Sequence, residues 1–118
     1  MTPSIDRAAL NDLLEATGND RAFLVELIDT YLTDSAALLA SMRQAVGAAD
    51  ATALRRAAHS LKSNSASLGA RELSARCQEL EQDAKNGSLE GAEARLVSIA
   101  AVFADVEREL HALQDEFK

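Results

Sequence analysis

The apolar residues near the C-terminal end of the chain constrain its fold more than any other feature. They recur at alternating intervals of three and four residues, as Leu96, Ile99, Phe103, Val106, Leu110, Leu113 and Phe117. This is the 3.5-residue period of helices that pack with a left-handed twist, and such a row of side chains must be covered by partner helices. We therefore expect a helix over residues 89–117 in an all-α protein.

The rest of the chain is expected to form four more helices. It has one proline and five glycines, alanine and leucine are abundant, and strand patterns are absent. Capping residues (Asn19 or Asp20, and Asp50) and glycines bound helices predicted over residues 5–16, 20–48, 51–68 and 70–86. Because the connections are short, successive long helices should run antiparallel. The prediction is a single domain over residues 1–118, an up-down-up-down antiparallel four-helix bundle with a short additional N-terminal helix.

Charge and composition exclude several classes of partner. The chain carries 12 Lys and Arg against 19 Asp and Glu, a formal net charge of −7. Nucleic acids and anionic membranes attract basic surfaces, so neither is expected as a partner. No apolar run approaches the roughly 18 residues that a membrane-spanning helix needs. With one cysteine and no pattern of a secretory signal at the first residues, we expect a cytoplasmic protein without direct membrane contact.

His59 lies in a segment without acidic residues, because no Asp or Glu occurs from Ala51 to Ala70. Three basic residues and a small polar one share its side of a helix, within about 60° at 100° per residue: Arg55, Arg56, Lys62 and Ser63. The apolar residues of the segment point the opposite way: Leu54, Leu61 and Leu68. A core histidine would lie on the leucine face, so we expect the ring of His59 to face solvent.

These surroundings suit a histidine that carries an anion, and a phosphoryl group is the candidate. Cations within one helical turn disfavour an added positive charge on the ring, which favours the neutral, nucleophilic form. The same cations stabilise a phosphorylated ring through charge-assisted contacts. A merely solvated histidine would leave the absence of acidic neighbours unexplained.

A specific string of residues surrounds His59. Before it stand Asp50, Leu54, Ala57 and Ala58, and after it Lys62, Ser63, Leu68-Gly69-Ala70, Leu73 and Leu80-Glu81. On these residues, and over nearly its whole length, the chain resembles the histidine-containing phosphotransfer (HPt) family of bacterial phosphorelays. The resemblance implies a four-helix bundle whose exposed histidine accepts a phosphoryl group from a receiver-domain aspartate and passes it to another. His59 would be the phosphorylated residue, and Lys62 the lysine that the family has three positions later.

Ser63 departs from the family pattern, which usually has glycine four residues after the histidine. A residue at that position lies one turn further along the same face, so a large side chain would shade the nucleophilic nitrogen. Serine keeps most of the clearance, and its hydroxyl could contact the phosphoryl oxygens. Arg55 and Arg56 are candidates to support the phosphoryl group or the receiver, although an ordinary solvated face would also explain Arg56.

The helix expected at residues 70–86 offers two side chains, Gln78 and Glu81, that could orient the ring of His59. The resemblance implies that the distal ring nitrogen is phosphorylated and that the other is held by a hydrogen bond. On the histidine's own helix, Asn64 and Ser65 lie near the buried flank and could bond across to the helix at residues 70–86.

Two other reactive side chains, Cys77 and His111, are not expected to take part in phosphotransfer. Cys77 falls in a core stripe with Leu73 and Leu80, which indicates a buried structural thiol. His111 flanks the C-terminal seam on a charged helix, and we do not expect it to carry a phosphoryl group.

The sequence contains no motif for catalysis of its own. A glycine-rich phosphate loop, a metal-ligand spacing and a Ser-His-Asp arrangement are all absent, so we expect no ATP site, no metal and no cofactor. The expected partners are response-regulator receiver domains, which would bring their own Mg²⁺, a hybrid sensor histidine kinase, or both, and the protein is expected to be a monomer. Two alternatives remain open: the phosphotransfer domain of a chemotaxis-type histidine kinase, and a helical adaptor that is not phosphorylated. No motif identifies the donor, the acceptor, the direction of flux or the pathway output.

Overall fold

The computed structural model describes residues 4–118, so the first three residues of the predicted domain lie outside the described residues. Residues 4–118 form five α-helices and no strands: α1 (Arg7–Ala16), α2 (Arg21–Gly47), α3 (Ala51–Ser67), α4 (Arg71–Lys85) and α5 (Ala92–Phe117). The prediction of an all-helical chain is confirmed. None of these helices is both long and apolar enough to cross a membrane.

Helices α1, α2 and α3 each begin after an aspartate whose side chain accepts a hydrogen bond from a backbone N–H of the first turn. Asp20 accepts a hydrogen bond from the Phe23 amide at 2.9 Å, and Asp50 accepts one from the Ala53 amide at 3.0 Å. Helix α5 starts at Ala92, three residues later than the sequence indicated, because Gly91 adopts a left-handed conformation (φ 75°) that a continuous helix does not permit. The other boundaries lie within two residues of the expected ones.

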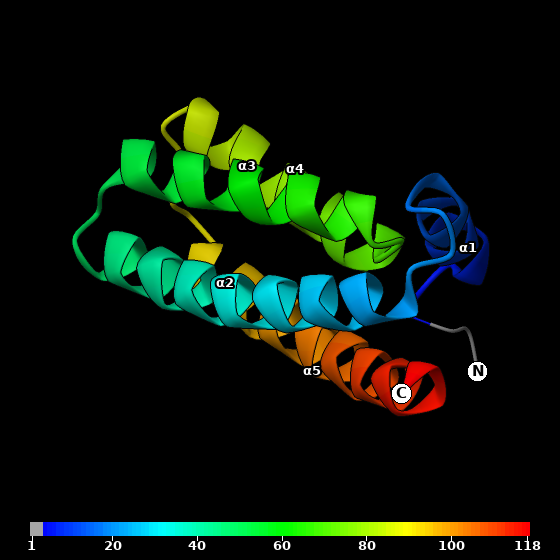
Figure 1. Cartoon of the computed structure of the whole chain (residues 1–118). Helices are drawn as coiled ribbons and strands as arrows, with labels where there is room; N and C mark the ends of the chain where they lie inside the picture. Colours follow the sequence, from blue (N-terminus) through cyan, green and yellow to red (C-terminus); the bar gives the residue numbers. More distant parts are fainter. Residues whose placement is uncertain (1–3) are drawn as a thin grey trace.

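The four longer helices lie side by side along the long axis of the molecule, and α1 lies at one end (Figure 1). Helix α3 packs against α2 and most extensively against α4, and α5 packs against α2 and α4. Each long helix therefore has two long neighbours, which gives every apolar stripe a covered side.

The core contains both sets of apolar residues that the sequence predicted to be buried: the leucine face of the helix that carries His59 and the apolar row of the C-terminal helix. Leu54 and Leu61 of α3 are fully buried and Leu68 is 3% exposed. The seam of α5 is buried from Leu96 to Leu113, and its last member, Phe117, is half-buried. Burial of the leucine face of α3 turns the opposite face of that helix, with His59, to the surface.

The expected hydrogen bonds from Asn64 and Ser65 to the neighbouring helix are wrong. Asn64 is exposed, and the buried Ser65 hydroxyl bonds the hydroxyl of Tyr31 in α2 at 2.8 Å. One of the polar contacts between α3 and α4 is made by Ser74, whose hydroxyl donates to the backbone carbonyl of Lys62 at 3.0 Å.

Candidate functional site

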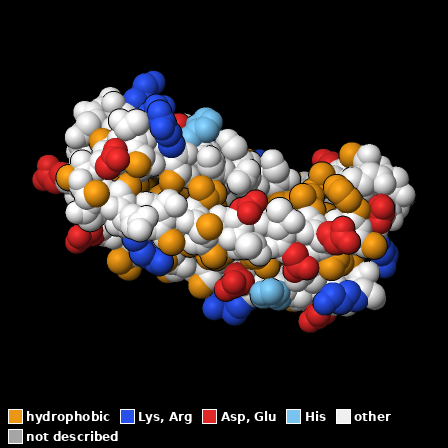
Figure 2. All heavy atoms as spheres, turned by 60° about the vertical axis from the view of Figure 1, so that its left-hand side comes forward, with side chains coloured by type: hydrophobic (Ala, Val, Ile, Leu, Met, Phe, Trp, Pro, Cys, Tyr) orange, Lys and Arg blue, Asp and Glu red, His pale blue; other side chains and the backbone are white. Residues whose placement is uncertain are grey.

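His59 lies on the outer face of α3, and 58% of its side-chain surface is exposed. In the upper part of the molecule in Figure 2, where α3 and α4 lie, a histidine is exposed with basic side chains beside it. The ring is therefore accessible to a second molecule, as the helical geometry predicted.

The carboxylate of Glu81 in α4 lies between His59 and Lys62. Its Oε2 is 2.7 Å from Nδ1 of His59, and its Oε1 is 2.6 Å from Nζ of Lys62. The Glu81 side chain is only 14% exposed, and that of Lys62 is 25% exposed. One carboxylate thus binds two side chains of the facing helix, each through a different oxygen.

The charge state of Glu81 fixes which ring nitrogen carries the proton. The ammonium of Lys62, and after it the ring of His59, hold the pKa of the Glu81 carboxyl below its usual value despite the opposing effect of burial. An ionised carboxylate can only accept hydrogen bonds, so Nδ1 of His59 must be the donor. In the neutral ring, the lone pair available for chemistry then belongs to Nε2.

The absence of acidic residues around His59 holds along the sequence but not in space. Glu81 is 22 residues away in the chain and reaches the ring from the neighbouring helix. The charge of Lys62 is therefore compensated by an acidic side chain that was not expected so close to the ring. Of the two residues suggested as partners for the ring, Glu81 contacts it, whereas Gln78 is exposed and makes no hydrogen bond to it.

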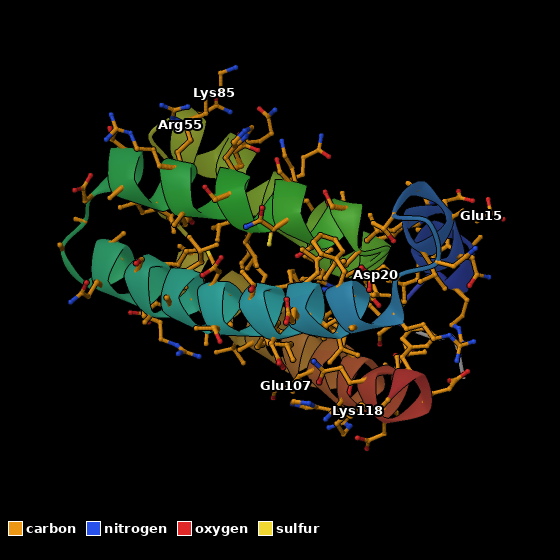
Figure 3. The ribbon with its side chains drawn as sticks, viewed as in Figure 1. Glu15, Asp20, Arg55, Lys85, Glu107 and Lys118 are labelled. Carbon is orange, nitrogen blue, oxygen red and sulfur yellow. The ribbon has the colours of Figure 1, made fainter. Side chains whose placement is uncertain are left out.

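Two arginines remain as cations beside the histidine. Arg55 is half-buried and Arg56 is exposed, and within residues 4–118 neither forms an ion pair. Lys85, at the end of α4, lies on the same side of the α3–α4 pair as Arg55 (Figure 3). Lys85 was not predicted on this side of the molecule, and its one signal in the sequence is its position one turn after Glu81 on the same helix.

Ser63 is exposed one turn after His59 on α3. Its backbone carbonyl accepts a hydrogen bond from the Ser67 hydroxyl at 3.1 Å. The side chain is small, so this side of the ring is not covered by its own helix.

Cys77 and His111, the two reactive side chains not expected to take part in phosphotransfer, both lie outside the site around His59. Cys77 is fully buried, and burial raises the pKa of its thiol to about 12, which excludes a thiolate nucleophile at neutral pH. His111 lies on α5, where its Nδ1 is 3.2 Å from Oε1 of Gln114. Gln114 in turn donates to the Val25 carbonyl and to Asp29, so this network joins α5 to α2. Within residues 4–118, no cluster of three or more His, Cys, Asp or Glu side chains has the arrangement of a metal site.

Two comparisons with known proteins identify the family of the chain. The model of the Hpt domain family matches residues 26–116. The crystal structure of histidine-containing phosphotransfer protein B from Pseudomonas aeruginosa PAO1 is similar with a TM-score of 0.92 and 33% sequence identity, over 100% of both chains. No curated protein matches the chain. The chain therefore belongs to the Hpt domain family, whose members are phosphotransfer intermediates in phosphorelays.

Proposed function

We propose that His59 accepts a phosphoryl group from the aspartate of one receiver domain and transfers it to the aspartate of another. The observation that carries this proposal is the hydrogen bond between Nδ1 of the exposed ring and the ionised Glu81. In the neutral ring, this bond places the proton on Nδ1 and leaves the lone pair of Nε2 free for attack, without the need for a separate base.

The chemistry of the transfer can be followed atom by atom. The lone pair on Nε2 attacks the phosphorus of the acyl phosphate, the P–O bond to the aspartate breaks, and the aspartate leaves as a carboxylate. The ring keeps its Nδ1–H and gains a positive charge, which the adjacent carboxylate of Glu81 offsets. The reverse sequence returns the group to a second receiver. The receiver's Mg²⁺ would stabilise the charge that develops on the phosphoryl oxygens.

The residues around His59 have supporting roles in this proposal. Arg55 and Arg56 attract the phosphoryl group or the acidic active site of the receiver, since they form no ion pairs within residues 4–118. Ser63 leaves room for the receiver to approach the ring. The scaffold is an up-down-up-down antiparallel bundle of the four long helices, with α1 laid against one end.

The wider setting is also part of the proposal. The protein acts in the cytoplasm as a monomer, without an ATP site or a cofactor of its own, and it binds neither nucleic acid nor membrane. Its partners are receiver domains, a hybrid sensor histidine kinase, or both.

A labelling experiment tests the assignment of His59. The purified protein is incubated with each ³²P-labelled receiver of the source genome, and His59→Gln is compared with the control His111→Gln. We expect acid-labile label in the wild type and in His111→Gln, none in His59→Gln, and the same helical circular dichroism in all three. Label that persists in His59→Gln would refute the assignment, and self-labelling from ATP and Mg²⁺ alone would refute the absence of an ATP site.

A further inference from the structure

A groove between the C-terminal end of α2 and the N-terminal part of α5 takes no part in the proposed phosphotransfer. It encloses about 460 Å³, and its apolar lining consists of Val46, Gly47, Leu96, Val97 and Ala100. Val97 is 73% exposed, and within residues 4–118 it is one of two large apolar residues that are exposed. The groove therefore presents apolar surface that the described part of the chain does not cover.

The surface beside the groove is poor in charge. Although 26% of the chain is charged, no Asp, Glu, Lys or Arg occurs at positions 35–42 of α2 or at positions 96–104 of α5. Apart from Ser41 and Val97, the exposed residues of these two stretches are all alanine. The centres of protein interfaces are depleted of charge in the same way, and small side chains let a further helix approach closely.

Two charged residues line the groove, Arg43 from α2 and Glu93 from α5. Within residues 4–118, neither forms an ion pair. On the other side of α5, by contrast, Arg95 pairs with Glu79 and Asp83 of α4 at 2.7 and 2.8 Å. The groove thus has one free charge of each sign, on opposite walls.

We propose that the groove binds a second copy of the chain, related to the first by a two-fold axis. In such a pair the same surface is used twice, so every contact occurs twice. Val97 of each chain enters the groove of the other, and Arg43 of each chain pairs with the partner's Glu93. A surface with one apolar projection, one groove and one charge of each sign is complementary to itself, which favours a second copy over an unrelated protein.

The pair leaves the phosphotransfer site open. Helices α3 and α4 form one half of the bundle and α2 and α5 the other half (Figure 1), and His59 lies on the outer face of α3. The two copies therefore meet on the side away from His59, and each can still bind a receiver. Because Val97 is the one large exposed side chain of the groove, the contact is of the small, reversible class. The monomer proposed above is then the form at low concentration.

Sedimentation equilibrium of the unphosphorylated protein, at concentrations up to about 1 mM, measures this association. The average mass of the wild type should rise from the 12.6 kDa of one chain toward twice that value. Val97→Asp should stay at the mass of one chain. Phe23→Asp, the same change at the other exposed apolar residue, should associate like the wild type. A wild type that never exceeds the mass of one chain, or a Val97→Asp variant that associates as it does, would overturn the proposal.

Two charge reversals test the ion pair across the two-fold axis. Arg43→Glu brings two acids together in the pair and Glu93→Arg two bases, so each variant alone should stay at the mass of one chain. In an equal mixture of the two variants, an acid meets a base at both symmetry-related positions, and association should return to about the wild-type level. A mixture that stays at the mass of one chain would contradict the proposed contacts.

Phosphotransfer separates this pairing from a receiver site in the groove. At low concentration, Val97→Asp should take label from a phospho-receiver at a rate within about twofold of the wild type, because the groove lies away from His59. Slowing by about tenfold or more would place the receiver in the groove and overturn the proposal. Absence of label on wild-type His59 would refute the proposed function instead, and the masses would still decide whether the chain pairs with its own copy.

Discussion

Gly69, two residues after the end of α3, should be the least replaceable glycine of the described chain. Its φ is +80°, and a Cβ added there would lie 2.7 Å from the backbone oxygen of Asp6 and 3.3 Å from its nitrogen. Asp6 cannot easily retreat. Its amide donates to the Gly69 carbonyl at 2.8 Å, and its side chain pairs with Arg71 at 2.8 Å. The change Gly69→Ala therefore forces a backbone segment away from the end of α3.

The expected loss of stability combines two effects. A non-glycine residue in the left-handed region costs about 1–2 kcal/mol. Displacement of a packed backbone segment adds about 1–3 kcal/mol, including the strained hydrogen bond to Asp6. The free energy of unfolding should fall by about 2–5 kcal/mol, a large part of the roughly 5–15 kcal/mol typical of a domain.

Gly87 supplies a matched control, because its φ is +76° and an added Cβ would meet nothing within 4 Å. Gly87→Ala should cost only the conformational term of about 1–2 kcal/mol. Urea unfolding of both variants and the wild type, followed by circular dichroism at 222 nm, measures the difference. Equal losses in the two variants would show that contact with Asp6 contributes nothing and would refute the reasoning.

Two further predictions concern the site. Ser63→Gly and Ser63→Ala should both transfer phosphoryl groups normally, although the glycine variant should lose about 0.5–1 kcal/mol in stability. Ser63→Phe should weaken receiver binding and transfer with little loss of fold. Receiver titration and single-turnover kinetics measure these effects. An impaired Ser63→Ala would assign a role to the hydroxyl, and a fully active Ser63→Phe would refute the need for clearance. Glu81→Gln should be less stable than the wild type above pH 4.5, the ordinary pKa of Glu, since the pKa of Glu81 is lowered in the folded state, mainly by Lys62. That difference in thermal stability should disappear as the pH falls below 4.5 and Glu81 becomes protonated in the wild type, and a difference that stays constant down to acid unfolding would contradict the ion pair.

The helices could be predicted where their signals are local. The seam of α5 and the leucine face of α3 follow from spacing along one element, and both are buried in the structure. The start of α5 could not be predicted. The left-handed conformation at Gly91 separates residues 89 and 90 from the helix, although the side chains of these two residues do not exclude a helix. Boundaries of this kind depend on one backbone angle that the side chains around it do not reveal.

The site could be predicted only as far as it lies on one helix. The outward direction of His59 and its spacing from Ser63 follow from 100° per residue. The contact with Glu81 depends on how α3 and α4 are rotated about their axes. The sequence indicated two candidate partners for the ring, Gln78 and Glu81, but did not distinguish between them. The compensation of Lys62 was missed for the same reason, because a count of charges along the chain does not include the acid on the next helix. Tyr31, the partner of Ser65, was missed because that flank of α3 faces α2 and not α4.

The packing of α3 on α4 therefore sets the chemistry of the site as well as the stability of the fold. A helix advances about 1.5 Å and turns 100° per residue, so a slip of one residue between the two helices would carry Glu81 out of hydrogen-bond reach of the ring. Leu61 and Leu80, each fully buried and each next in sequence to a site residue, oppose such a slip from the core side. On the outer side, the Ser74 hydroxyl on the Lys62 carbonyl opposes it as well. The distance of 2.7 Å between Glu81 and His59 thus depends on core packing and on a hydrogen bond that do not involve the ring, and a core substitution that shifts this register should slow transfer even where the fold survives.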